Sequence, residues 1–148
     1  EYGDFEKMKL LKTLNCPCDS SVFDYSVKNG NLEIIVWLIK NNFPCNTYAF
    51  RYAAIGGNLD IMKLLFAINC PYDSYMFNYA VANGNLEIVK WLINNNFPYD
   101  EYAFKYAAFD GSLKIMKLLA ENNFPYTKSN ILSYARNSSV KKWIKKNL

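Results

Sequence analysis

The residue types present limit the chemistry that this sequence could perform. It contains no histidine, which removes the commonest general base and the commonest metal ligand. A serine or cysteine nucleophile activated by histidine is therefore excluded. Three carboxylates, Glu33, Asp60 and Glu87, share one position in the first turn of an expected helix, where they complement the helix dipole. No phosphate-binding loop or paired-acid motif appears, so we expect no enzyme activity and no cofactor.

Four cysteines are the remaining reactive groups. Cys16 and Cys18 form the one close pair, and without a second such pair a four-ligand zinc site is not expected. All four cysteines flank prolines in expected loops. We expect equivalent loops to be too far apart for a disulfide, which needs Cα atoms within about 7 Å. The spacing therefore favours reduced thiols in a cytosol-like compartment.

Composition indicates a folded protein that lies outside membranes. Of the 148 residues, 51% are hydrophobic and 20% are charged, which is ordinary for a globular chain. The longest apolar run, residues 34–39, is far shorter than the roughly 20 residues that a membrane helix needs. No secretory signal opens the chain. We expect a cytoplasmic protein that is neither secreted nor transmembrane.

Net charge is +4, but the positive charge is concentrated at the C-terminal end. Residues 128–148 hold six basic residues and no acidic one, whereas acidic residues outnumber basic ones in the rest of the chain. The sequence therefore does not support a uniformly basic nucleic-acid-binding body.

A period of 27 residues runs through the chain, and it determines the elements that must position these groups. Five prolines keep this spacing: Pro17, Pro44, Pro71, Pro98 and Pro125. Four glycines keep it too, namely Gly30, Gly57, Gly84 and Gly111, and Gly3 extends it backwards. We expect one array: a truncated first repeat (1–18), repeats at about 19–45, 46–72, 73–99 and 100–126, and a degenerate C-terminal capping repeat (127–148).

Each unit predicts a short helix, a tight turn, a second helix and a loop. The first helix is capped by a polar side chain in the column Asp19, Asn46, Asp73, Asp100 and Thr127. Glycine in the left-handed conformation ends it. The second helix is capped at Asn31, Asn58, Asn85 and Ser112, and a left-handed asparagine ends it in the column Asn15, Asn42, Asn69, Asn96 and Asn123.

Such a helix pair cannot bury its apolar face alone, so neighbouring pairs must stack into one core. Paired alanines such as Ala53 and Ala54 allow close helix contact. A phenylalanine column, Phe23, Phe50, Phe77 and Phe104, would fill the space between layers. Trp37 and Trp91 are expected to pack in the core. The expected fold is an all-α solenoid with almost no strand.

The unit resembles the ankyrin repeat. The resemblance rests on Ala53–Leu65 and Ala107–Leu119, which both read Ala-Ala-x-x-Gly-x-Leu-x-Ile-x-Lys-x-Leu in outline. The period is shorter than the usual 33 or so residues, and Tyr102-Ala103-Phe104-Lys105 stands where that family has Thr-Pro-Leu-His. The chain therefore resembles the short ankyrin type of large DNA viruses of amoebae, with β-hairpins reduced or absent.

This resemblance implies a non-enzymatic scaffold that binds a protein partner on the concave face formed by its first helices. For a viral protein the location would be the host-cell cytoplasm or the virus particle. Positions that differ between repeats are candidates for recognition: Asp24, Lys28, Asn29, Arg51, Ile55, Asn78, Ala82, Asn83, Lys105, Phe109 and Asp110. Solvated surface without a partner remains open for each of them.

Tyrosine forms two further columns. For Tyr25, Tyr52, Tyr79, Tyr106 and Tyr134 we favour packing between repeats over partner binding. For Tyr48, Tyr75 and Tyr102 the two interpretations are nearly even, and these three are included as candidate contacts.

Two alternatives stay open. The last expected helix, residues 140–147, carries Lys141, Lys142, Lys145 and Lys146. This basic patch could bind nucleic acid or a membrane, although a solvated cap is the favoured interpretation. The other alternative is a structural or self-assembling component of a viral assembly. The sequence predicts no small-molecule substrate and does not identify the partner.

Overall fold

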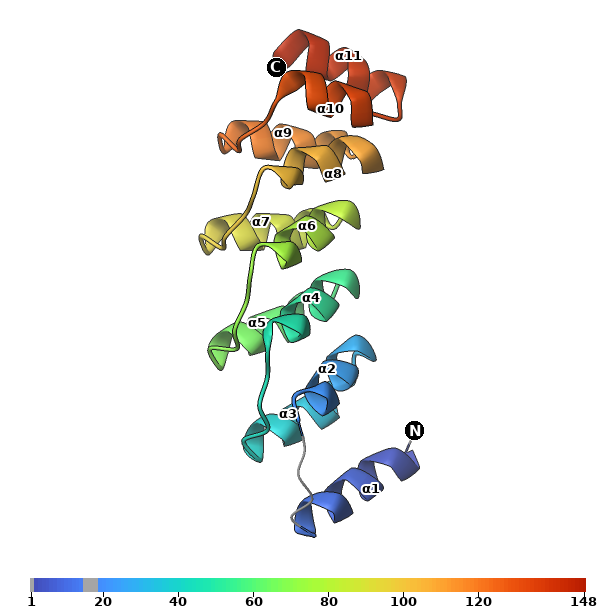
Figure 1. The fold of residues 1–148 in the computed structure, drawn as a ribbon, viewed down its shortest axis with the longest axis vertical. Helices are drawn as coiled ribbons and strands as arrows, with labels where there is room; N and C mark the ends of the chain where they lie inside the picture. The colour runs from blue at the N-terminus through green and yellow to red at the C-terminus, as the bar shows by residue number, and fades with distance from the viewer. Residues whose placement is uncertain (1, 15–18) are drawn as a thin grey trace.

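The computed structural model describes residues 2–14 and 19–148, and within these ranges every regular element is an α-helix (Figure 1). The elements are α1 (Tyr2–Thr13), α2 (Ser21–Lys28), α3 (Leu32–Lys40), α4 (Thr47–Ile55), α5 (Leu59–Ala67), α6 (Tyr75–Ala82), α7 (Leu86–Asn94), α8 (Tyr102–Asp110), α9 (Leu113–Glu121), α10 (Lys128–Tyr134) and α11 (Ser138–Asn147).

The helices form a stack of pairs. From α2 onward each even-numbered helix, here called a first helix, is followed by a second helix, and the pairs lie one above another in register (Figure 1). Neighbouring first helices pack closely, whereas neighbouring second helices make fewer contacts. The first helices are therefore on the concave side of the stack. The predicted all-α solenoid is confirmed.

Predicted caps account for most helix starts. The side chains of Asp19, Asn46, Asp73 and Asp100 each accept a hydrogen bond from the backbone N–H two residues later, at 2.8–3.1 Å. Asn31, Asn58 and Asn85 accept from the N–H three residues later, at 3.0–3.1 Å. The predicted caps Thr127 and Ser112 make no side-chain cap bond.

Left-handed residues end the helices as predicted. Asn42, Asn69, Asn96 and Asn123 have φ angles of 54–56°, and Asn15 lies outside the described residues. At Gly57, φ is +67° and an added Cβ would lie 3.1 Å from the Asn85 amide nitrogen, so the turn between α4 and α5 also needs its glycine for space. Gly3 differs, because it lies inside α1 and not at a turn.

The core follows the predicted columns. Phe23, Phe50, Phe77 and Phe104 are 0–1% exposed. Ala53, Ala54, Ala107 and Ala108 are also buried and let the helices approach closely. Trp37 and Trp91 are half-buried against this core; the Trp91 ring meets Phe97 at 5.0 Å between centroids.

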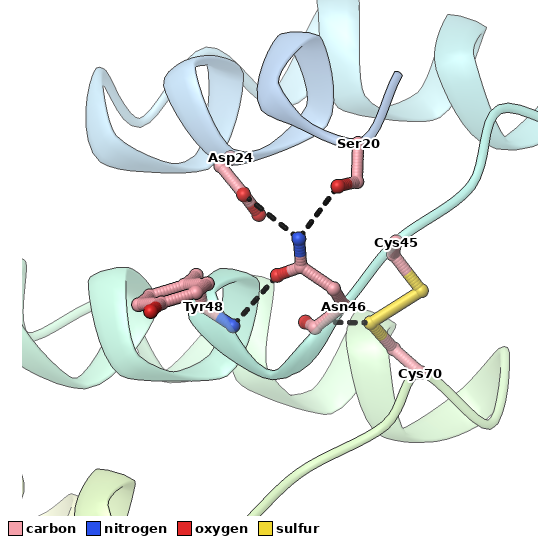
Figure 2. Close-up of a disulfide and its surroundings, with 6 residues drawn as sticks. All are labelled: Ser20, Asp24, Cys45, Asn46, Tyr48 and Cys70. Carbon is pink, nitrogen blue, oxygen red and sulfur yellow. Dashed lines mark hydrogen bonds between the residues drawn. A yellow bond between two sulfur atoms is a disulfide. The ribbon is translucent and has the colours of Figure 1, made fainter.

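The cysteine expectation is wrong for one pair. Cys45 and Cys70 form a disulfide, with Cα atoms 5.9 Å apart (Figure 2). The two positions are not equivalent, because Cys45 follows Pro44 and Cys70 precedes Pro71. Cys45 lies in the loop between α3 and α4, and Cys70 lies in the loop between α5 and α6. Cys16 and Cys18 lie outside the described residues.

The same two positions hold aromatic pairs at the next two junctions. Tyr72 meets Phe97 with ring centroids 4.7 Å apart, and Tyr99 stacks on Phe124 at 3.8 Å. The disulfide therefore replaces an aromatic contact that joins successive loops elsewhere in the stack.

The final pair has a shorter first helix and a longer second helix than the pairs from α2 to α9. Its second helix, α11, begins at Ser138, two residues before the predicted start at Val140, because the Asn137 side chain caps it by accepting from the Val140 N–H at 2.7 Å. The four lysines of the predicted basic patch are exposed on this helix: Lys141, Lys142, Lys145 and Lys146.

Candidate functional site

Exposed tyrosines lie on the first helices. Tyr48, Tyr75 and Tyr102 are 51, 55 and 46% exposed. A second tyrosine lies four residues later on the same helix, which is one turn away on the same face. We call these residues the tyrosine stripe: Tyr25, Tyr48, Tyr52, Tyr75, Tyr79, Tyr102 and Tyr106.

The favoured packing interpretation of the Tyr25 column is wrong for Tyr25 itself, whereas the other members are only partly exposed. Tyr25 is 65% exposed, and Tyr79 and Tyr106 are each 39% exposed, whereas Tyr52 is half-buried. Both columns therefore contribute rings to the surface.

Cations lie between these rings. The Arg51 guanidinium carbon is 4.8 Å from the Tyr48 ring centroid and 4.7 Å from that of Tyr75. Lys105 Nζ similarly lies between Tyr102 and Tyr134, at 5.3 and 4.3 Å. Each cation joins two layers through cation–π contacts, which are worth roughly 0.5–1 kcal/mol at exposed sites. These contacts restrict the motion of the rings on the concave face.

At three junctions the residue after the core phenylalanine joins one layer to the next. The Asn78 amide donates to both carboxylate oxygens of Asp100, at 3.0 and 2.9 Å. Arg51 Nε donates to Asp73 at 3.1 and 3.3 Å, and the two residues form a salt bridge. Every such pair links this position to the cap residue 22 positions later.

Two candidate recognition residues are therefore corrected. Asn78 is only 4% exposed and cannot present a free surface. Asp24 is half-buried and accepts from the Asn46 amide at 3.1 Å (Figure 2). The side chain after the core phenylalanine contacts the cap residue of the next layer. Its type therefore varies between repeats together with the type of that cap residue. The complementary types at positions i and i+22 are the sequence signal that could have shown this.

Burial affects the titration of these pairs. Desolvation raises the pKa of Asp24 above its ordinary value, although the Asn46 hydrogen bond acts in the opposite direction. One Asp24 oxygen, Oδ1, is buried without a hydrogen-bond partner. The hydrogen bond with Asp73 raises the pKa of Arg51.

The candidates near the glycine turns have mixed surroundings. Lys28, Asn29, Ile55, Asn83, Phe109 and Asp110 are exposed, and Ala82 is half-buried. Two of the exposed residues also contact the neighbouring layer. The Asn83 amide donates to the Ile55 carbonyl at 2.9 Å, and the Arg136 guanidinium covers the Phe109 ring at 3.5 Å.

The part of the chain that the structure describes contains no group of three or more cysteine, aspartate or glutamate side chains that could hold a metal ion. None of the described helices is both long and apolar enough to cross a membrane.

Comparison with known proteins identifies the repeats. A family model described as ankyrin repeats, in three copies, matches residues 23–100 and again residues 77–144. Together the two matches include most of the chain. No curated protein matches it.

Proposed function

Because this chain belongs to the ankyrin repeat family, whose repeats are generally protein-interaction modules, we propose that it is a non-enzymatic scaffold that binds another protein across the concave face of its first helices. The observation that carries this proposal is the tyrosine stripe. Tyrosine is enriched at the energetic centres of protein interfaces, since it buries a large area at a low cost in side-chain entropy.

Rigidity supports the same conclusion. The rings project from helices whose layers are tied together by the Asn78–Asp100 and Arg51–Asp73 pairs and by the Cys45–Cys70 disulfide. A surface that is already ordered loses less conformational freedom when a partner docks. Binding would need neither catalysis nor a cofactor.

Crosslinking mass spectrometry on the full chain with its captured partner tests the face. We expect crosslinks from Lys28 and Lys105, which lie on first helices. Lys63 and Lys90 on the second helices should give few. Crosslinks concentrated on Lys63 and Lys90 would overturn the proposed face.

The basic patch on α11 supports a second candidate function. Its four exposed lysines lie on a second helix, whereas the tyrosine stripe lies on first helices, and they could bind nucleic acid or an anionic membrane. Affinity for duplex DNA or anionic vesicles should then fall steeply with salt and vanish when all four lysines are changed to glutamine. Binding that is independent of salt would remove this candidate.

The short period supports the narrower resemblance to the ankyrin repeats of large DNA viruses of amoebae, and with it a place in the host-cell cytoplasm or a viral assembly. A self-assembling component would increase in mass with concentration. Light scattering across a concentration series separates that role from a monomeric scaffold.

A further inference from the structure

A cavity of about 280 Å³ opens between α8 and α10. Its lining includes Tyr102 and Lys105 from α8, and Thr127, Asn130, Ile131 and Tyr134 from the last layer. The cavity adjoins the tyrosine stripe, because Tyr102 belongs to both.

The repeat pattern explains why a cavity forms at this junction. Position 131 continues the buried phenylalanine column of Phe77 and Phe104, but holds the smaller Ile131. Position 127 continues the cap column of Asp73 and Asp100, but holds Thr127, which has no carboxylate. The first change removes side-chain volume between α8 and α10, and the second removes a carboxylate at nearly unchanged volume.

The second change leaves a cation without the partner that its position has elsewhere. Lys105 stands where Arg51 stands two layers earlier, and Arg51 forms a salt bridge with Asp73. The corresponding partner of Lys105 is Thr127, and among the described residues Lys105 forms no salt bridge within 4.0 Å. Its ammonium group instead lies 4.3 Å from the Tyr134 ring centroid.

The lysine remains a cation at neutral pH. The neighbouring Tyr134 side chain raises the pKa of Lys105 above the ordinary value. One carboxylate, that of Glu101, is also part of the lining, but it is exposed at the rim and does not pair with Lys105. The cavity therefore contains a lysine without the carboxylate partner that Arg51 has at the equivalent position.

We propose that this cavity receives the carboxylate of an aspartate or glutamate side chain from the partner protein, in the place that Asp73 takes beside Arg51. The proposal rests on the proposed function and specifies the chemistry that the partner presents at this end of the face. The carboxylate would pair with Lys105, and the polar side chains of Thr127 and Asn130 lie in the same lining. Phe104 and Ile131 would contact the methylene groups of the incoming side chain.

Titration with a minimal ligand tests the cavity directly. N-acetyl-glutamate N-methylamide is added to the isotopically labelled full chain, and amide NMR shifts are followed. We expect saturable shifts confined to residues around Lys105 and Asn130, and at least tenfold weaker binding of the neutral N-acetyl-glutamine N-methylamide. Equal binding of the two compounds, or no localised shifts, would overturn the proposal.

Two substitutions separate the cavity from its surroundings. Lys105→Gln should abolish the difference between the two compounds, whereas Lys114→Gln, on exposed α9 surface, should leave it unchanged. Thr127→Asp should rebuild the internal pair, raise the melting temperature and block the ligand. A Thr127→Asp protein that is folded and still binds the glutamate compound normally would contradict the proposed site.

The same Thr127→Asp variant distinguishes the two proposals once a partner is known. If tyrosine-stripe variants lose the partner while Thr127→Asp retains it at full affinity, the cavity proposal fails and the binding face stands. If both variants retain the partner, the binding face itself fails.

Discussion

Replacing Cys45 and Cys70 with serine measures what the crosslink contributes to the stack. The disulfide closes a loop with a sequence separation of 25 residues. The chain-entropy relation for a loop of that length gives about 3.5 kcal/mol of free energy of unfolding. Because the crosslink joins α4 and α5 to the layer before them through adjacent loops, we expect the loss to be concentrated there.

Thermal and urea unfolding monitored by circular dichroism test this expectation. The double serine variant should melt roughly 7–14 °C below the oxidised wild type, and hydrogen exchange should accelerate most in α2 to α5. A second variant, Cys45→Tyr with Cys70→Phe, copies the aromatic pairs of the next two junctions and should regain part of the loss.

Reductant provides the control. It should lower the melting temperature of the wild type and leave both variants unchanged. The reasoning is refuted if reduction does not lower the melting temperature of the wild type and the double serine variant melts at the wild-type temperature. The crosslink would then contribute nothing to the stability of the stack.

Three further predictions concern the core, titration and turns. Phe77→Ala should cost about 3–5 kcal/mol of unfolding free energy by urea titration, because a fully buried ring is lost, and a cost below 1 kcal/mol would contradict the stacked core. Asp24→Asn should raise stability at pH 7, because burial disfavours the charged carboxylate, and this gain should shrink as the pH falls through the raised pKa of Asp24; a gain that does not change with pH would refute it. Asn96→Ala should cost about 1–2 kcal/mol by thermal unfolding, since its φ is 54°, whereas the control Asn94→Ala in helix α7 should be nearly neutral.

The repeat made much of the fold predictable from sequence. A residue type that recurs at one position in several repeats reports the backbone conformation there, as the left-handed Asn69 and Asn96 show. The buried Phe50 and Phe77 were identified in the same way. Local backbone geometry can thus be predicted from a single sequence when that sequence contains several repeats of the same structural unit.

Contacts between non-equivalent positions were harder to predict. Comparing equivalent positions alone missed the disulfide, because Cys45 and Cys70 occupy different positions in their repeats. The same comparison assigned Asn78 to a binding surface. Its residue type instead matches that of its hydrogen-bond partner 22 positions later, Asp100. Pairing between layers depends on how one layer sits over the next, which the period does not specify.

The affinity of the partner for two triple variants tests the account most directly. One variant replaces Tyr48, Tyr75 and Tyr102 with alanine on the concave side, and its matched control replaces Lys63, Lys90 and Lys117 with alanine on the second helices. Calorimetry should show at least about a 30-fold loss for the tyrosine variant, or roughly 2 kcal/mol, and little change for the control. Unchanged affinity of the folded tyrosine variant, or a larger loss in the lysine variant, would contradict binding across the concave face.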